Sequence, residues 1–283
     1  MTDKYAVIGN PIAHSKSPLI HRMFAEQTGQ DINYEAILAP LDSFAATIKR
    51  LRAEGYKGCN ITVPFKFEAF ELATRLDPLA EIAQAVNTLK FNHDEIMGYN
   101  TDGRGLAADI QFNLKIDLKN KNVLLAGAGG AASGVVHSLA TMGARIIIAN
   151  RNVEKAQILV DRFSPLFAPP HHHSNATKPP PARSVALSYA DLADQQFDIV
   201  INATSASLTD SEIPLPATIF APGALAYDMM YGRETPFMKF AREHGAAVVA
   251  DGLGMLVEQA AEAFYLWRGV RPDTASVLKK LRA

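Results

Sequence analysis

The sequence predicts an α/β fold built from two successive α/β units, each with a mostly parallel sheet. Short apolar runs rich in β-branched residues alternate with segments of helical periodicity along most of the chain, and this alternation is typical of α/β proteins. The length of 283 residues indicates two domains. A glycine-rich turn over residues 127–132 follows one of the apolar runs near mid-chain and belongs to the second unit.

The first unit begins with an expected strand over 5–10. Ser17 as an N-cap and Pro18 at the first helical position predict a helix that reaches Thr28 and ends at Gly29. The other elements expected in this unit are strands over 33–40 and 57–64, a helix over 43–54 capped by Asp42 or Ser43, helical pattern from Lys66 to about Leu76, and a hairpin of strands 86–91 and 95–100 around Asn92-His93-Asp94.

The second unit starts at Lys121, where the chain reads as strand, glycine turn, helix and strand up to Arg151. Further strands are expected over 197–204, 224–231 and 246–252. The five prolines of residues 168–183 predict a loop there. We interpret the three histidines of this loop, His171 to His173, as a solvated tract rather than a metal site, because no cysteine or acidic ligand stands close by.

Charge and composition exclude several classes of protein. The 28 basic and 29 acidic residues give no uniform basic field for nucleic acid. No apolar run approaches the roughly 20 residues that span a bilayer, and the N-terminus lacks the pattern of a signal peptide. Cys59 is the only cysteine and is interpreted as a small buried hydrophobe. We therefore expect a cytoplasmic protein with no metal, nucleic-acid or membrane partner.

The glycine turn carries Gly127-x-Gly129-x-x-Ala132, a form of the dinucleotide fingerprint. In that fingerprint the first glycine permits a tight turn, the second lets the backbone approach a pyrophosphate, and the small third residue lets the helix pack on the sheet. The free N–H groups and the dipole at the start of the following helix also favour the binding of an anion. The motif alone is weak evidence for cofactor binding. Here it follows a predicted strand and opens a predicted helix, and this context favours a cofactor site over a glycine turn used only for packing.

The end of the next strand indicates which dinucleotide is bound. NAD-preferring folds place an acidic residue there to hold the ribose 2′-hydroxyl, whereas this chain has Asn150-Arg151, with Lys155 shortly after. An arginine can grip a 2′-phosphate with two parallel hydrogen bonds. The alternative is that Arg151 and Lys155 are surface charges, but cations at a helix start oppose the helix dipole. The pattern favours NADP(H).

Polar residues of the first unit gather where strands end or helices start. They are His14 to Ser17 after the first strand, Lys66 after the third, Asn87, and Thr101-Asp102-Gly103 after the hairpin. A lysine at a helix start is in a setting that can tune it toward proton transfer. Each residue also has a plain structural interpretation: Lys66 as a snorkelling surface lysine, Ser17 and Asp102 as N-caps, Asn87 as a turn residue. Together they offer hydroxyl, amide, carboxylate and ammonium groups to a small polar ligand.

These and further motifs resemble the shikimate dehydrogenase family, and they occur in the family's order from residue 5 to about 275. The matching pieces are Ser15-Lys16-Ser17-Pro18, Asn60-Ile61-Thr62-Val63-Pro64-Phe65-Lys66, Ala85-Val86-Asn87-Thr88, Asn100-Thr101-Asp102-Gly103, Gly127-Ala128-Gly129-Gly130-Ala131, Asn150-Arg151, Asn202-Ala203-Thr204-Ser205, Tyr227-Asp228-Met229-Met230-Tyr231, and Asp251-Gly252-Leu253-Gly254-Met255-Leu256-Val257-Glu258-Gln259.

The resemblance implies an NADP-dependent oxidoreductase of aromatic amino-acid biosynthesis that reversibly reduces 3-dehydroshikimate to shikimate. It implies that Lys66 and Asp102 are the catalytic acid–base pair. The implied substrate contacts are Ser15, Ser17, Thr62, Lys66, Asn87, Asp102, Tyr231 and Gln259. The implied cofactor contacts are Gly127, Ala128, Gly129, Gly130, Ala131, Asn150, Arg151, Asn152, Lys155, Thr204, Met229 and Gly252.

The same resemblance implies a discontinuous substrate-binding domain over 1–103 and 253–283, and a Rossmann-type NADP-binding domain over 104–252, separated by a cleft. A monomer or a homodimer is expected. One departure concerns the cofactor: Asn152 and Lys155 stand where the family often has a threonine and a second arginine. Lysine keeps the charge but loses the planar fork, so a weaker grip on the 2′-phosphate is expected.

Two alternatives to this function stay open at the level of sequence. A relative that oxidises quinate or shikimate with NAD is disfavoured by Asn150-Arg151. A catalytically silent NADP-binding regulator on the same fold predicts the loss of Lys66 or Asp102, and both are present.

Overall fold

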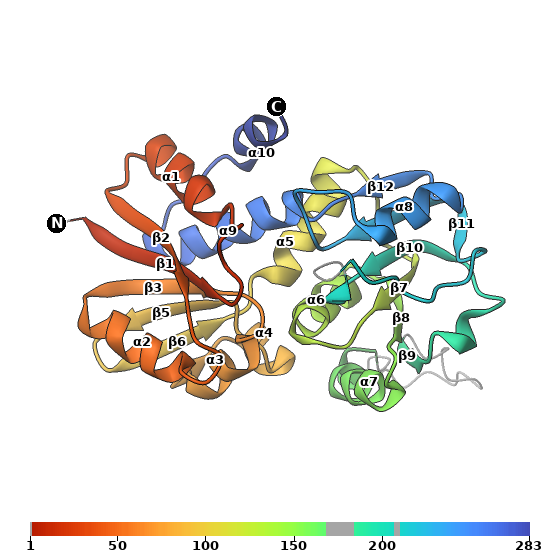
Figure 1. Cartoon of the computed structure of the whole chain (residues 1–283), viewed down its shortest axis with the longest axis horizontal. Coiled ribbons are helices and arrows are strands. Elements are labelled where there is room, and N and C mark those ends of the chain that lie inside the picture. The colour runs from red at the N-terminus through yellow and green to blue at the C-terminus, as the bar shows by residue number, and fades with distance from the viewer. Residues whose placement is uncertain (1, 168–183, 207–209) are drawn as a thin grey trace, which may run out of the picture. The chain divides into compact units, whose positions relative to one another are not determined.

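The computed structural model describes residues 2–167, 184–206 and 210–283, and the chain divides into two compact units (Figure 1). Unit 1 comprises Met1–Leu114 and Gly254–Ala283, and unit 2 comprises Lys115–Leu253. The loop expected over 168–183, with its three histidines, lies outside the described residues. None of the described helices is long and apolar enough to cross a membrane.

Unit 1 is an α/β sandwich around a six-stranded sheet of order β2-β1-β3-β5-β6-β4. Only β5 runs against the other strands, so the predicted, mostly parallel sheet is confirmed. Its elements are β1 (Asp3–Gly9), α1 (Ser17–Thr28), β2 (Ile32–Leu38), α2 (Phe44–Ala53), β3 (Tyr56–Ile61), α3 (Lys66–Leu72), β4 (Arg75–Leu76), α4 (Pro78–Ala83), β5 (Thr88–Asn92), β6 (Glu95–Tyr99), α5 (Asp102–Ala108), the π-helical η1 (Asp109–Asn113), α9 (Leu253–Arg268) and α10 (Thr274–Arg282).

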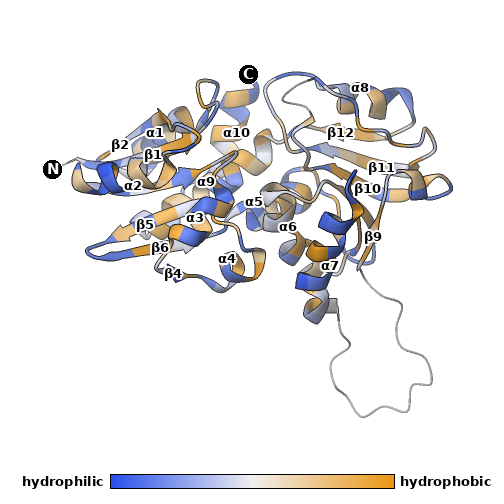
Figure 2. Ribbon diagram, turned by 60° about the horizontal axis from the view of Figure 1, so that its bottom comes forward, coloured by the Kyte–Doolittle hydropathy of each residue, from blue (hydrophilic) through white to orange (hydrophobic). Residues whose placement is uncertain are grey.

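The side chains of β1 alternate between two buried clusters, which shows that the sheet of unit 1 is covered on both faces. Ala6 and Ile8 belong to a buried cluster with residues of α2, α3 and α4. Tyr5 and Val7, on the opposite face, pack with Trp267 of α9. Because successive side chains of a strand point to opposite faces, one apolar run serves both cores. Figure 2 shows hydrophobic residues along the strands, with hydrophilic residues on helices such as α2.

Three local predictions in unit 1 were wrong. The helix expected to run to Leu76 ends at Leu72, because the chain then forms β4, and α4 starts separately after Asp77, whose carboxylate accepts a hydrogen bond of 2.9 Å from the Ala80 amide. The strand expected to reach residue 64 ends at Ile61. Ser17 is the first residue of α1 rather than its cap, and the N-cap is Lys16 without a side-chain bond.

The chain first crosses from unit 1 to unit 2 after Leu114, whereas the crossing was expected after residue 103. The reason is that α5 packs closely on α9. A Cβ atom at Gly105 would lie 2.7 Å from Cβ of Gln259. Arg104 also reaches Glu262 of α9 at 3.4 Å.

Unit 2 has a fully parallel six-stranded sheet of order β12-β11-β10-β7-β8-β9. Its elements are β7 (Asn122–Ala126), α6 (Gly130–Thr141), β8 (Arg145–Ala149), α7 (Val153–Phe167), β9 (Ser184–Leu187), the 3-10 helix η2 (Ala190–Leu192), β10 (Phe197–Asn202), β11 (Phe220–Asp228), α8 (Pro236–Glu243) and β12 (Val248–Ala250). Numbered from β7, the order is 6-5-4-1-2-3, the arrangement of dinucleotide-binding sheets. The predicted Rossmann-type unit is confirmed, and β9 and α8 are additions to the predicted elements.

His21 of α1 is a buried histidine in the core of unit 1. It is fully buried and stacks on Tyr34 with ring centroids 4.0 Å apart. Within the part of the chain that the structure describes, neither ring nitrogen meets the geometric criteria for a hydrogen bond. Burial lowers the pKa of His21 to about 3, and the neighbouring Asn60 side chain opposes only part of that shift.

Stability should therefore depend on pH through His21. Because the folded pKa lies below the unfolded value of 6.5, the unfolded state takes up the proton first as the pH falls. The free energy of unfolding should fall below pH 6.5, by up to about 1.4 kcal/mol per pH unit from this group. Urea unfolding between pH 7.5 and 5 measures the slope. His21→Phe should flatten it and His93→Asn, in the exposed hairpin turn, should not; equal slopes for all three proteins would contradict the assignment.

Candidate active site and cofactor site

The candidate active site of unit 1 lies where the ends of several strands meet. Thr88, the first residue of β5, pairs with Asn60 near the end of β3 and with Tyr99 at the end of β6. Asn87 therefore lies beside the segment that follows β3 and the segment that follows β6. The end of β1 lies on the other side of β3, since Ile8 pairs with Ile61. In open α/β sheets such carboxyl ends are where ligands bind.

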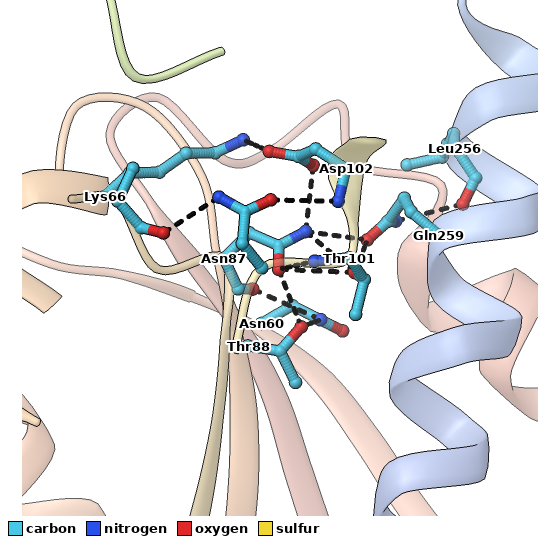
Figure 3. A network of polar contacts seen from close by, with 10 residues as sticks. Asn60, Lys66, Asn87, Thr88, Thr101, Asp102, Leu256 and Gln259 are labelled. Atoms are coloured by element: carbon cyan, nitrogen blue, oxygen red, sulfur yellow. Dashed lines mark hydrogen bonds and ion pairs between the residues drawn. The ribbon is translucent and has the colours of Figure 1, made fainter. Parts of the chain in front are cut away.

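Lys66 and Asp102 form an ion pair at this edge (Figure 3). Lys66 is the first residue of α3, and its carbonyl accepts a 2.9 Å hydrogen bond from the Val86 amide. Asp102 is the first residue of α5, after the N-cap Thr101, so it is not itself the cap. The side chains are 15% and 6% exposed. An ammonium group has three N–H donors, and among the described residues Lys66 donates only to Asp102, which leaves two donors for a ligand.

Asn87 holds the second oxygen of Asp102. Its Nδ2 donates to Asp102 Oδ1 at 2.8 Å, while its Oδ1 accepts from the Thr101 amide at 2.9 Å. Asn87 is 2% exposed. Both oxygens of the Asp102 carboxylate are thus bonded, which is what a buried charge requires to be tolerated. The arrangement fixes the position of the carboxylate and, through it, of the Lys66 ammonium group.

Gln259 of α9 completes this network from a segment distant in sequence. Its Oε1 accepts from Asn87 Nδ2 and from the Thr101 hydroxyl, both at 3.3 Å. Its Nε2 donates to the Leu256 carbonyl at 2.9 Å. The glycine at position 105 makes this approach possible, because any side chain there would collide with Gln259.

The other predicted substrate residues of unit 1 surround the same strand ends. Ser15 lies in the loop after β1, and its Oγ accepts from the Ser17 amide at 3.3 Å. Thr62 directly follows β3, and its amide donates to the Ile8 carbonyl at 2.9 Å. Tyr231 is the exception among the predicted substrate contacts, because it belongs to unit 2.

The glycine turn of unit 2 has the geometry of a phosphate cradle. Gly127 follows β7 with φ +112, and a Cβ there would lie 3.1 Å from the Ala203 backbone. Gly129 is the N-cap of α6 and has open space on its Cβ side. The turn leads from β7 into α6, and β7 is flanked by β10 and β8, which is where the strand order reverses. The remaining positions of the turn are filled by Ala128, Gly130 and Ala131.

The loop after β8 presents the predicted 2′-phosphate residues. Arg151, Asn152 and Lys155 are all exposed. Asn150 Nδ2 donates to the Asn152 carbonyl at 2.9 Å, and Asn152 Oδ1 accepts from the Lys155 amide at 2.9 Å. Asn152 thus orders the start of α7, and the exposed cationic side chains of Arg151 and Lys155 are of a type that suits an anion. With the glycine turn, they are the groups of unit 2 that would hold NADP(H).

The remaining predicted cofactor residues follow β10, β11 and β12. Thr204 donates to Asn202 Oδ1 at 2.7 Å, and the Met229 amide donates to the Asn202 carbonyl at 3.0 Å. The Gly252 amide donates to the Met230 carbonyl at 2.8 Å, and a Cβ at position 252 would collide with the Met229 backbone. A glycine is therefore needed there for close backbone packing.

Sequence reasoning assigned no role to Asn60 or Thr88, and it singled out Thr101 only as a neighbour of Asp102. All three are buried polar residues in the network of Figure 3. For Asn60 the signal in the sequence was a polar residue near the end of an otherwise apolar strand. No cluster of metal-ligating side chains exists among the residues that the structure describes.

A fully parallel dinucleotide-type sheet with a glycine turn, together with a buried lysine–aspartate pair, defines a dehydrogenase of the two-unit α/β class. Family descriptions match three parts of the chain: "Shikimate dehydrogenase substrate binding domain" over 7–89, "Shikimate / quinate 5-dehydrogenase" over 107–209 and "Shikimate 5'-dehydrogenase C-terminal domain" over 252–282.

Full-length relatives agree with these matches. The chain is 55% identical over 282 residues to the shikimate dehydrogenase (NADP(+)) of Methylobacillus flagellatus, covering 99% of each chain. It is also 55% identical to the enzyme of that name from Dechloromonas aromatica, covering 98% of it. The crystal structure of shikimate 5-dehydrogenase from Thermus thermophilus in complex with NADP(H) and shikimate superposes with a TM-score of 0.82 at 30% identity over 99% of both chains. The chain belongs to the shikimate dehydrogenase family.

Asn87→Ala should destabilise unit 1 as well as the site. The substitution leaves the buried Thr101 amide and Asp102 Oδ1 without their partner, and a buried group left unsatisfied costs about 1–3 kcal/mol. Urea unfolding measures the loss. Asn92→Ala, in the exposed hairpin, is the control and should change stability by less than about 0.5 kcal/mol. Equal stability of the two variants would contradict the described network.

Proposed function

We propose that this protein is an NADP(H)-dependent shikimate dehydrogenase that reversibly reduces 3-dehydroshikimate to shikimate. The observation that carries the proposal is the Lys66–Asp102 pair, held by Asn87 at the strand ends of unit 1, in a chain whose relatives bear this name over their full length. The glycine turn and Arg151 of unit 2 support NADP(H) as the cofactor.

In this proposal Lys66 is the general acid of the reduction. NADPH, when bound, supplies the hydride that forms the new C–H bond. As the carbonyl π bond breaks, negative charge develops on oxygen, and the nearby ammonium group stabilises it and donates the proton that forms the O–H bond. Lys66 is left as a neutral amine and regains a proton from solvent. In the reverse direction the neutral amine accepts the proton of the substrate hydroxyl.

Asp102 orients Lys66 and accepts a hydrogen bond from a substrate hydroxyl. Its carboxylate keeps the ammonium group in place, because the Asn87 amide anchors the other carboxylate oxygen. Ser15 and Ser17 bind the substrate carboxylate, and Thr62, Asn87 and Gln259 complete the contacts of unit 1 to the ring and hydroxyls. Tyr231 of unit 2 stays a predicted substrate contact. This set of donors suits a small anion rich in hydroxyl groups.

The proposal extends to the setting of the enzyme. It acts on a free small molecule in the cytoplasm, within the pathway to aromatic amino acids, as a monomer or a homodimer. Gel filtration with light scattering distinguishes the two assemblies.

Lys66→Ala should lower kcat for shikimate oxidation by about 100- to 10,000-fold, the usual cost of removing a positioned acid–base group, with a smaller effect on KM. Absorbance at the nicotinamide band measures turnover. Lys57→Ala is the matched control, since Lys57 is an exposed lysine of the neighbouring β3. A large rise in KM at normal kcat would contradict the acid–base role. A wild-type protein that binds NADP(H) without turnover would favour the silent regulator.

Arg151→Ala should raise KM for NADP+ by about 10- to 100-fold, because a charge-assisted hydrogen bond contributes about 1.5–3 kcal/mol. KM for NAD+, which has no 2′-phosphate, should change little. Arg145→Ala, at the exposed start of β8, serves as the control. If the wild type prefers NAD+, or if Arg151→Ala changes KM for NADP+ and for NAD+ equally, the alternative is favoured: an enzyme that oxidises quinate or shikimate with NAD.

A further inference from the structure

A chain of buried hydrogen bonds runs from Tyr34 of β2 to the ion pair. The Tyr34 hydroxyl donates to Asn60 Oδ1 at 2.7 Å. Asn60 Nδ2 donates to Thr88 Oγ1 at 2.9 Å, and that hydroxyl donates to Asn87 Oδ1 at 3.0 Å. Asn87 Nδ2 then bonds Asp102, as described above. Figure 3 shows the part of this chain from Asn60 to Lys66.

The direction of donation is set by backbone groups, whose roles cannot be exchanged. The Thr101 amide can only donate, so the Asn87 atom that it faces is the oxygen. The Asn87 carbonyl can only accept, so the Asn60 atom that faces it, at 3.3 Å, is the nitrogen. Asn60 therefore turns its oxygen toward Tyr34, and the phenol must be the donor.

Tyr34 is held rigidly by aromatic neighbours. Its ring is nearly parallel to that of His21, with an interplanar angle of 8°, and lies 6.2 Å from the Trp267 ring. The ring stacking does not involve the hydroxyl group. A phenylalanine at this position would keep the packing and lose only the donor.

We propose that Tyr34, Asn60 and Thr88 are positioning residues for the Lys66–Asp102 pair, and that the Tyr34 hydroxyl acts on it through the two amides and the threonine. This inference rests on the proposed function, because it concerns the rate of that reaction. Without the Tyr34 donor, Asn60 Oδ1 is buried without its partner, and the Asn60 amide loses the bond that fixes its orientation on that side. The Asn60 amide cannot turn over, because its oxygen would then face the Asn87 carbonyl. It can shift, which weakens the bond from Asn60 Nδ2 to Thr88 and, through the Thr88 hydroxyl, the bond that helps to orient Asn87 toward Asp102.

Tyr34→Phe should lower kcat about fivefold, the effect of one net hydrogen bond, while KM for shikimate changes less than about twofold, because Tyr34 does not touch the substrate. Tyr5→Phe is the matched control. Tyr5 is also buried, at 3% exposure against 9% for Tyr34, and stacks on the same Trp267 at 4.6 Å, but its hydroxyl interacts with Arg268 rather than with Asn60. It should lower thermal stability as Tyr34→Phe does and leave kcat unchanged.

The next link of the chain provides an independent test. Thr88→Val removes the hydroxyl at nearly constant shape and should lower kcat, whereas Thr88→Ser keeps the hydroxyl and should recover most of the loss. The double variant Tyr34→Phe/Thr88→Val should lose no more turnover than Thr88→Val alone, since both changes break one chain. If Tyr34→Phe fails to fold, the comparison of Thr88→Val with Thr88→Ser decides the inference.

The outcomes separate this inference from the proposed function. Suppose that the wild type oxidises shikimate. Equal kcat values for Tyr34→Phe and Tyr5→Phe would then overturn the positioning chain and leave the proposed function intact. So would a double variant whose loss of kcat is the product of the losses of Tyr34→Phe and Thr88→Val. A wild type without shikimate turnover overturns both. An equal loss of kcat in Thr88→Val and Thr88→Ser also overturns the chain, because it shows that side-chain packing rather than the hydroxyl matters.

Discussion

The pairing of Thr88 with both Asn60 and Tyr99 is the constraint on which the candidate site depends. It makes the antiparallel strand β5 start where β3 and β6 end. Three chain segments that carry Lys66, Asn87 and Asp102 therefore emerge side by side. A shift of β5 by one residue would turn Thr88 to the face of the sheet opposite Asn60 and break the hydrogen bonds that order Asn87.

The partly buried ion pair is tolerated because both oxygens of its carboxylate are hydrogen-bonded. Removing two charges from water costs several kcal/mol per ion, which their attraction offsets only with good geometry and further hydrogen bonds. Asn87 and the Thr101 backbone supply that support, and Gln259 of α9 supports Asn87 in turn. The result is a site built from four separate segments of the chain, those of Lys66, Asn87, Asp102 and Gln259, in which the ammonium group, as far as the described residues show, keeps donors for a ligand.

Local sequence signals predicted most elements of both units, because strands and helices here have clear periodicity and clear ends. The glycine turn and the hairpin around Asn92-His93-Asp94 lie where they were expected. The errors occurred where local signals are ambiguous: the short β4 reads as helix, since a two-residue strand has no periodicity of its own. Ser17 and Pro18 fit two helix starts one residue apart, and the backbone decides between them: the Ile20 amide donates to the Lys16 carbonyl at 3.1 Å, so that Lys16 is the N-cap.

The sequence by itself determined the two α/β units, the glycine turn, the Arg151 that follows β8, and the candidate status of Lys66, Asn87, Asp102 and Gln259, because residue types and short-range patterns carry that information. Only the tertiary structure decided which of these side chains meet. Lys66, Asn87, Asp102 and Gln259 lie far apart in the chain, and the strand register and the close packing at Gly105 bring them together. The roles of Asn60 and Thr88 likewise emerge only there, because a buried hydrogen bond depends on distance and orientation in space.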